Sequence, residues 1–344
     1  MTTRSMSCAR WQSGLTLVEL MVSITLGLMI LSGVLAVFFN TSSARNEVER
    51  TSRQIENGRF AVELISTDLR LAGFYGELDV ATVAAPAAVP ANPCSLAAAD
   101  WNAWIPVHIQ GFDNAGFVSA ACPFANLKTD TDVLVVRRAR ACAAGIAGCE
   151  AVDTDDAYLQ AGLCPDVNTT HRLRVHGGVN FDLQKKDCAT PADLRQYLVH
   201  VYYVSTKNGD GVDLPTLKRF ELKLGEFKDM PLVEGIEEFQ VEYGLDTDGD
   251  GAPDAYAANP GNFPKGACAG ACPLTNWMNV VTVRIHLLAR NLEPSPGFTD
   301  AKTYELGNDI DGNPVTRTPG LAFRRHVYSS LVRVANVAGR RDKP

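Results

Sequence analysis

The sequence predicts an α+β protein: a long N-terminal α-helix packed on an antiparallel β-sheet head whose loops are tied by disulfides. Three observations lead to this prediction. An apolar run follows residue 14 and passes into a stretch with helical spacing up to residue 72. Segments in which apolar and polar residues alternate fill the C-terminal half, as in antiparallel sheets with one buried face. Eight cysteines lie beyond the apolar run, which is typical of exported, disulfide-bonded domains.

The apolar segment, residues 15–39, is 25 residues long, whereas roughly 20 residues span the core of a bilayer. Glu19 is its only charged residue. A charge at the centre of a membrane helix costs about 2.5–3.5 kcal/mol, so the acid indicates a partner for it. Residues 1–14 carry Arg4 and Arg10 and no acid. The positive-inside rule therefore keeps this end in the cytoplasm and places the C-terminal bulk outside.

Two simple interpretations of this segment are a secretory signal, cut near residues 42–44, and a plain signal anchor on a periplasmic protein. A signal peptide has an apolar core of about 7–15 residues, which is shorter than the run found here. In a plain anchor, Glu19 would be an acid tolerated near the membrane interface.

A third interpretation rests on Gly14-Leu15-Thr16-Leu17-Val18-Glu19, which resembles the class III leader of type IV prepilins. The resemblance implies that a prepilin peptidase cleaves after Gly14 and methylates the new N-terminus at Leu15. Leu15 stands where the family usually has phenylalanine. The new amine would pair with Glu19 of a neighbouring subunit, and breaking a buried ion pair costs about 3–5 kcal/mol. That cost would fix the register of a growing filament.

Polar residues with helical spacing continue the helix, and Gly73 and Gly76 are expected to end it. Six apolar positions share one stripe that we expect to pack on the head: Val48, Ile55, Val62, Ile65, Leu69 and Ala72. The predicted organisation has four parts: a cleaved cytoplasmic leader at 1–14, a transmembrane or filament-core half of the helix at 15–39, an amphipathic half at 40–76, and a periplasmic or extracellular β-rich head at 77–344.

Within the head, residues 80–99 are rich in Ala and Pro and are interpreted as a linker, and 101–188 as short strands and disulfide-tied loops. Strands are predicted at 196–205, 217–224, 239–243, 281–287 and 327–334. Cys8 lies in the leader, and the eight other cysteines are disulfide candidates: Cys94, Cys122, Cys142, Cys149, Cys164, Cys188, Cys268 and Cys272. Order along the chain favours the local closures Cys142–Cys149 and Cys268–Cys272. Zinc is disfavoured because no paired CxxC with histidine partners occurs.

Four segments resemble the PilW family of minor pilins: residues 68–74, 241–251, 281–290 and 330–336. The resemblance implies a pilin-like fold and a minor pilin that acts in the priming or tip complex of a type IV pilus. The implied partners are other minor pilins, the major pilin, the prepilin peptidase, an inner-membrane assembly platform and a tip adhesin. The protein would start as a single-pass inner-membrane protein with a periplasmic head and end in the pilus at the cell surface. A J-type pseudopilin of type II secretion is the alternative within the superfamily.

An acidic loop at 246–254 follows the spacing of an EF-hand calcium loop. Asp246, Asp248, Asp250 and Asp254 take positions 1, 3, 5 and 9, and the carbonyl of Ala252 takes position 7. Position 12, which should be a bidentate Glu, is Ala257. Calcium is therefore the expected cofactor, and the rival interpretation is a metal-free hairpin tip, since Asp-Gly pairs form turns.

The absence of known catalytic motifs favours a structural protein over an enzyme. No HExxH, GxSxG, P-loop or GxGxxG motif is present, and His200 and His286 fall in strand segments. The net charge is −7. Loss of residues 1–14 removes two arginines and no acid, leaving −9, which argues against a general nucleic-acid binder. A membrane-anchored periplasmic binding protein or enzyme stays open as the alternative of another class.

Overall fold

The structure is a computed structural model of the 344-residue chain. It describes residues 14, 16–115, 122–165, 169–177, 181–264 and 266–341. The predicted leader up to residue 13 and the predicted new N-terminus, Leu15, lie outside the described residues. The chain forms two compact units, residues 1–50 and 51–344.

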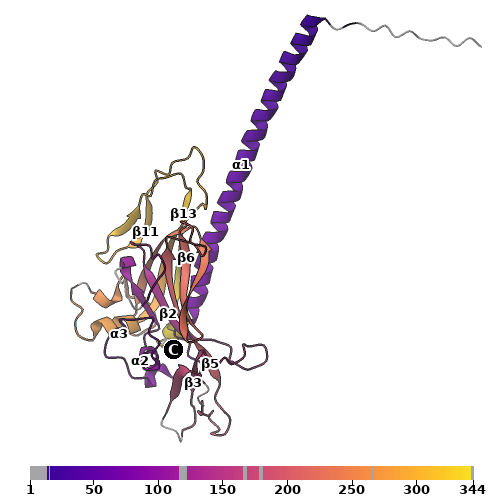
Figure 1. Cartoon of the computed structure of the whole chain (residues 1–344). Helices are drawn as coiled ribbons and strands as arrows, with labels where there is room; N and C mark the ends of the chain where they lie inside the picture. Colours follow the sequence, from indigo (N-terminus) through magenta and orange to yellow (C-terminus); the bar gives the residue numbers. More distant parts are fainter. Residues whose placement is uncertain are drawn as a thin grey trace, which may run out of the picture. The chain divides into compact units, whose positions relative to one another are not determined.

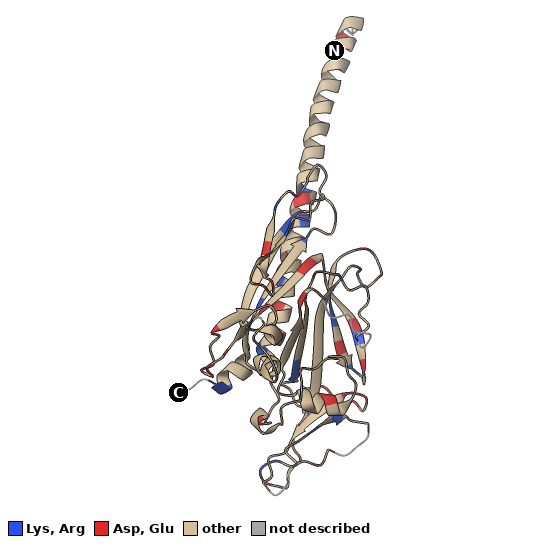
Figure 2. Cartoon of the chain, turned by 90° about the vertical axis from the view of Figure 1, so that its left-hand side faces the viewer, with Lys and Arg blue, Asp and Glu red and all other residues tan. Residues whose placement is uncertain are grey.

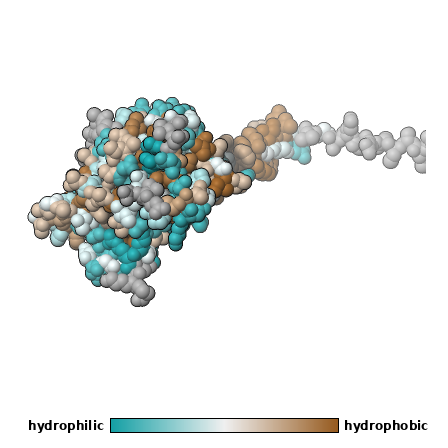
Figure 3. All heavy atoms as spheres, turned by 90° about the horizontal axis from the view of Figure 1, so that it is seen from below, coloured by the Kyte–Doolittle hydropathy of each residue, from teal (hydrophilic) through white to brown (hydrophobic). Residues whose placement is uncertain are grey.

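The first unit holds the N-terminal part of helix α1 (Leu17–Leu71). Within the described residues, α1 is the one helix that is long and apolar enough to cross a membrane. Its apolar side chains up to Phe39 are exposed to solvent (Figure 3). Along this stretch, no charged residue follows the first turn of the helix up to Phe39 (Figure 2). A helix that exposes so much apolar surface needs lipid or other apolar helices around it.

The second unit combines the rest of α1 with two main antiparallel sheets and a hairpin (Figure 1). The larger sheet has the order β1-β2-β5-β3-β4, and β6 pairs with β5 and β7 with β6. Its strands are β1 (Ile109–Phe112), β2 (Val133–Ala139), β3 (Ala157–Ala161), β4 (His171–Val175), β5 (Leu194–Ser205), β6 (Thr216–Lys223) and β7 (Glu226–Glu234). The smaller sheet has the order β13-β10-β8-β9. Its strands are β8 (Ile236–Leu245), β9 (Ala255–Ala257), β10 (Val280–Arg290) and β13 (Arg325–Arg333).

Short elements complete the head: the hairpin of β11 (Tyr304–Asn308) and β12 (Pro314–Arg317), and the helices α2 (Ala98–Trp104), α3 (Cys272–Met278) and α4 (Ala335–Arg341). The described 3-10 turns are η1 (Val80–Thr82), η2 (Asp113–Ala115) and η3 (Pro260–Asn262). The predicted class is therefore confirmed: a helix packs on antiparallel sheets. All five predicted strands are present, each longer or shifted by a few residues.

The seven-stranded sheet is buried on both faces around β2. Leu134 and Val136 join a core with α1 and the smaller sheet, whereas Val133 and Val135 join a second core that includes Trp101 of α2. A strand that is buried on both faces loses the alternation of apolar and polar residues. For this reason the run at 133–136 gave no distinct strand signal within the predicted loops.

The predicted stripe on α1 is correct only toward its C-terminal end. Ile65 and Leu69 are fully buried, but Ile55 is 43% exposed. The helix instead turns Gln54 and Gly58 inward. The Gln54 amide donates to the carbonyls of Ala289 and Arg324 at 2.8 and 3.1 Å. A Cβ on Gly58 would lie 2.2 Å from the Tyr328 ring, so only glycine fits here. This part of α1 therefore contacts the head through the polar Gln54 and the small Gly58.

The C-terminal end of α1 is capped by a residue near the C-terminus of the chain. The helix stops at Leu71, and Gly73 takes φ 71°, as predicted. The Asn336 side-chain amide, at the start of α4, donates to the carbonyls of Arg70 and Ala72, both at 3.3 Å. Carbonyls at the last turn of a helix have no partner within it, so α4 supplies one.

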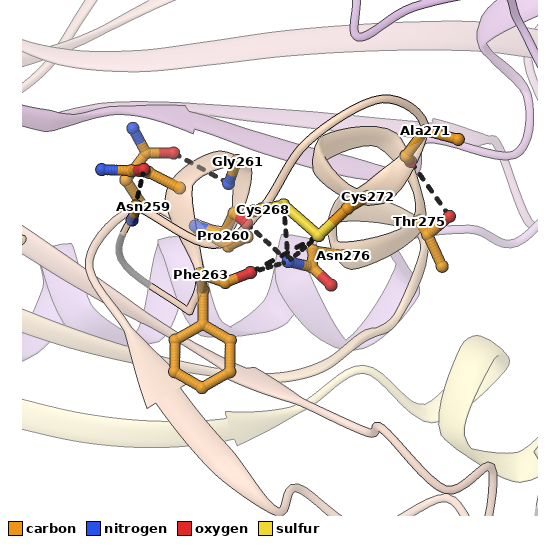
Figure 4. Close-up of a disulfide and its surroundings, with 11 residues drawn as sticks. Asn259, Pro260, Gly261, Phe263, Cys268, Ala271, Cys272, Thr275 and Asn276 are labelled. Atoms are coloured by element: carbon orange, nitrogen blue, oxygen red, sulfur yellow. Dashed lines mark hydrogen bonds between the residues drawn. A yellow bond between two sulfur atoms is a disulfide. The ribbon is translucent and has the colours of Figure 1, made fainter.

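The eight cysteines of the head form four disulfides: Cys94–Cys122, Cys142–Cys149, Cys164–Cys188 and Cys268–Cys272. The two local closures are those expected from the order along the chain. Figure 4 shows the last of them, where the Asn276 amide donates to the carbonyls of Pro260 and Phe263. Asn276 and the disulfide thus fold the segment between β9 and α3 back on itself.

Candidate functional site

The first candidate site is Glu19 on the apolar part of α1. Its backbone N–H donates to Thr16 Oγ1 at 3.3 Å, and its carbonyl accepts from Ser23 Oγ at 2.7 Å. The hydroxyls of Thr25 and Ser32 likewise donate to carbonyls of the same helix. These hydroxyls are satisfied locally, whereas no cation among the described residues pairs with the Glu19 carboxylate. Within the described part of the chain, Glu19 is thus an acid on an exposed apolar surface without an ionic partner.

The second candidate site is the acidic loop, which joins β8 to β9 across the pair Leu245↔Ala255. It is therefore also a hairpin, as the rival interpretation expected. Ligand oxygens of Asp246, Asp248 and Asp254 all lie within 4.8 Å of one another. Three carboxylates this close repel each other, and a bound cation would relieve that repulsion.

One of the predicted carboxylate ligands lies differently. Asp250 is outside this triad, and its Oδ1 accepts from Ala252 N at 2.8 Å. Ala257, at the position of the missing Glu, belongs to β9. The structure thus brings together three of the four predicted carboxylates.

Asp246 is held in place by three hydrogen bonds to its carboxylate. It is fully buried, and its oxygens accept from Gly249 N at 2.6 Å and Gly251 N at 3.0 Å. Arg341 of α4 donates to the same carboxylate at 3.2 Å. Burial opposes ionisation, but these bonds hold the pKa of Asp246 below its ordinary value. Asp246 therefore offers a full negative charge at neutral pH.

A third cluster, which the sequence did not indicate, lies where α1 meets β2 and β5. Asp68 is 4% exposed, and its two oxygens contact three side chains. Arg138 Nε donates at 2.6 Å, His200 Nδ1 lies 2.7 Å away, and Tyr202 Oη donates at 2.9 Å. Burial by itself raises the pKa of Asp68, but His200 and Arg138 together lower it well below its ordinary value. His200 is thus one of three side chains that hold the buried Asp68 carboxylate, rather than a lone strand residue.

One comparison with known proteins gives a match that is consistent with this architecture. A long N-terminal helix packed on antiparallel sheets with four disulfides is an α+β, pilin-like arrangement. Residues 201–336 match the PilW family model, type IV pilus-assembly protein W. This range runs from β5 into α4 and includes the acidic loop and three of the four segments that suggested the resemblance. No curated protein and no solved structure gives a significant match.

Proposed function

We propose that the chain is a minor pilin, a structural subunit of a type IV pilus that acts in the priming or tip complex of assembly. The observation that supports this most is the combination in one chain of a PilW match at 201–336 and an exposed apolar segment of α1, up to residue 39, with a single acid, Glu19. The match supports a role in pilus assembly, and the helix supplies the means of entering a filament.

In this proposal the four predicted parts of the chain have separate roles. Residues 1–14 are the leader, 15–39 the membrane and filament-core segment, 40–76 the amphipathic half of the helix, and 77–344 the head outside the cytoplasm. Prepilin peptidase cleaves after Gly14, and the methylated amine of Leu15 pairs with Glu19 of the next subunit. The partners are other minor pilins, the major pilin, the inner-membrane assembly platform and a tip adhesin.

The proposal predicts that Glu19→Ala subunits are cleaved and inserted in the membrane but are lost from sheared pili at least tenfold. An unpaired buried amine would cost about 3–5 kcal/mol. Immunoblots of membrane and pilus fractions measure the two pools. Glu49→Ala is the matched control, because Glu49 is an exposed acid on the same helix. Equal recovery of Glu19→Ala in pili would refute the pairing.

N-terminal sequencing of the protein from cells tests the class itself. A methylated N-terminus at Leu15 is expected, and a start near Arg45 would identify a secretory signal.

Recovery of the mature protein with a type II secretion system, and none in pili, would favour the J-type pseudopilin. An anchored enzyme or binding protein would stay active without prepilin peptidase.

We further propose that the acidic loop binds calcium through Asp246, Asp248 and Asp254, with the Ala252 carbonyl as a further ligand. The triad of carboxylates supports this proposal. Calcium should raise the melting temperature of the wild type over that in chelator. Asp248→Asn should reduce that shift by more than Asp250→Asn, because Asp250 is outside the triad. No shift with a folded head, or equal effects of the two variants, would contradict the site.

A further inference from the structure

We propose that the head binds a small apolar monocarboxylate in a pocket at the C-terminal end of α1, beside helix α4. The pocket has a volume of about 260 Å³, which is below the roughly 300–1,000 Å³ of pockets for drug-sized ligands. Its lining comes from the turn after α1, from η1, from the segment between α2 and β1, and from α3 and α4. We define this α4 pocket by six of its residues: Val80, Val83, Ile105, Met278, Arg340 and Arg341.

The walls of the α4 pocket are mostly apolar, and a ligand can reach them. The side chains of Val80, Val83 and Met278 are each partly exposed. A ligand that covers them removes apolar surface from water, which favours binding in proportion to the area covered. The walls therefore select a ligand with an apolar body.

Two further polar side chains in the lining carry no charge at neutral pH. Tyr75 and His108 are both 3% exposed. Burial raises the pKa of Tyr75 well above its ordinary value and lowers the pKa of His108 to about 4. Among the described residues, no carboxylate lines the pocket. Its only charged lining groups in that part of the chain are thus the two arginines of α4.

Arg340 gives the pocket a positive charge that no described carboxylate balances. Its side chain is exposed, and Nε donates to Asn336 O at 2.5 Å and Nη2 to Gly73 O at 2.7 Å. Two of its five N–H groups are thus used, and the other three have no partner among the described residues. Arg341, by contrast, is paired with Asp246 at 3.2 Å. One excess positive charge attracts a monoanion.

Both guanidinium groups are held in place before any ligand arrives. The two bonds above fix Arg340, and Arg341 Nη2 donates to Met278 O at 3.1 Å and Asn279 Oδ1 at 2.7 Å. A guanidinium presents a planar fork that matches a carboxylate, and a group that is already fixed loses little entropy on binding. A small apolar carboxylate pairs the charge and covers the walls. A neutral analogue leaves the charge unpaired, and a bare inorganic anion leaves the walls uncovered.

The test is NMR of the full chain with methyl-labelled methionine, in calcium-free buffer so that the acidic loop takes no part. The probes are phenylacetate and isovalerate, with neutral phenylacetamide and inorganic sulfate for comparison. The Met278 methyl reports on the pocket. Met230 of β7, which is 38% exposed and outside the lining, is the internal control. Phenylacetate should shift the Met278 signal saturably and leave that of Met230 unchanged.

Three variants link that signal to the pocket. Arg340→Gln removes the unbalanced charge and should weaken phenylacetate binding roughly ten- to hundredfold. Ala81→Phe fills the pocket from an exposed position in its lining and should abolish binding. Arg70→Gln makes the same change of net charge at an exposed arginine outside the lining and should leave binding unchanged.

Saturable binding of phenylacetate that Arg340→Gln weakens and Ala81→Phe abolishes supports the proposal. No shift of Met278 with either carboxylate, or equal binding by the wild type and both pocket variants, overturns it. Phenylacetamide that binds as tightly as phenylacetate overturns the role of the charge, and binding of sulfate alone overturns the apolar class of ligand. If Arg340→Gln lowers the melting temperature, Ala81→Phe keeps the test valid, because residue 81 is exposed.

Discussion

Asp68 shows how much one residue contributes to the junction between the helix and the sheet. Its carboxylate is buried with Arg138 and His200, and removal of one member of a buried pair costs about 3–5 kcal/mol. We therefore predict that Asp68→Asn lowers the free energy of unfolding at pH 7 by about that amount. Asp182→Asn is the control, because the Asp182 carboxylate pairs with Arg172 but is 61% exposed. The control should cost much less than Asp68→Asn, because solvent screens an exposed ion pair.

The same residue predicts a pH dependence. The folded pKa of Asp68 lies below its unfolded value. Its stabilisation is thus complete above the unfolded pKa of about 4 and is lost as the pH falls toward the folded pKa. Urea unfolding of the wild type and Asp68→Asn should therefore differ most at pH 7 and converge below pH 4. A constant difference between pH 7 and pH 3 would contradict the ion network.

Single residues also show which contacts could not be predicted from the sequence. Asp153, Asp155 and Asp156 form an acidic run that is typical of a solvated loop, yet Asp156 is 7% exposed and holds Gln196. In the acidic loop, three of the four carboxylates that the spacing predicted lie together, because a short loop constrains its own side chains. Asp156 and Asp68 contact residues that are distant in the sequence, and spacing carries no information about such pairs.

At the scale of elements, the disulfides should differ in their contribution to stability. Cys164–Cys188 closes a separation of 24 residues and Cys268–Cys272 one of 4. In the chain-entropy account these loops correspond to about 3.5 and about 2 kcal/mol. The double change Cys164→Ser and Cys188→Ser should thus lower the free energy of unfolding more than Cys268→Ser and Cys272→Ser. Denaturant unfolding without reductant measures both, and the reverse order would exclude this account.

Elements with clear periodicity were predictable, and those that depend on tertiary contacts were not. The strands β6 and β10 alternate along the sequence and were expected. The seven-residue helix α4 has no strong pattern of its own and is fixed by contacts with α1. Strand β7 contains Pro231 and has Val233 as its one buried residue, and a proline within an apolar run weakens a strand prediction. On α1, the inward Gln54 and Gly58 replace the apolar residues that the stripe would need.

At the scale of the whole molecule, the second unit should fold without the first. It begins at Thr51, and α1 contributes Ala61, Ile65 and Leu69 to its core, all fully buried. A chain that starts at residue 51 should therefore melt cooperatively, within a few degrees of the full chain. A chain that starts at residue 73 should not fold, because loss of a large core side chain costs about 2–5 kcal/mol each against a total of about 5–15. Circular dichroism on heating distinguishes the two, and cooperative melting of the shorter chain would contradict this assignment of the core.

The closure of α1 by the C-terminal segment also sets an order of events during synthesis. The helix leaves the ribosome first, but Gly58 meets Tyr328, and the carbonyls of Arg70 and Ala72 meet Asn336. These contacts become available only when nearly the whole head has been made. A chain that stops early keeps an open helix end and an uncovered core, and proteases degrade chains in proportion to such open forms. A chain therefore gains a closed helix end and a covered core only once its head is complete.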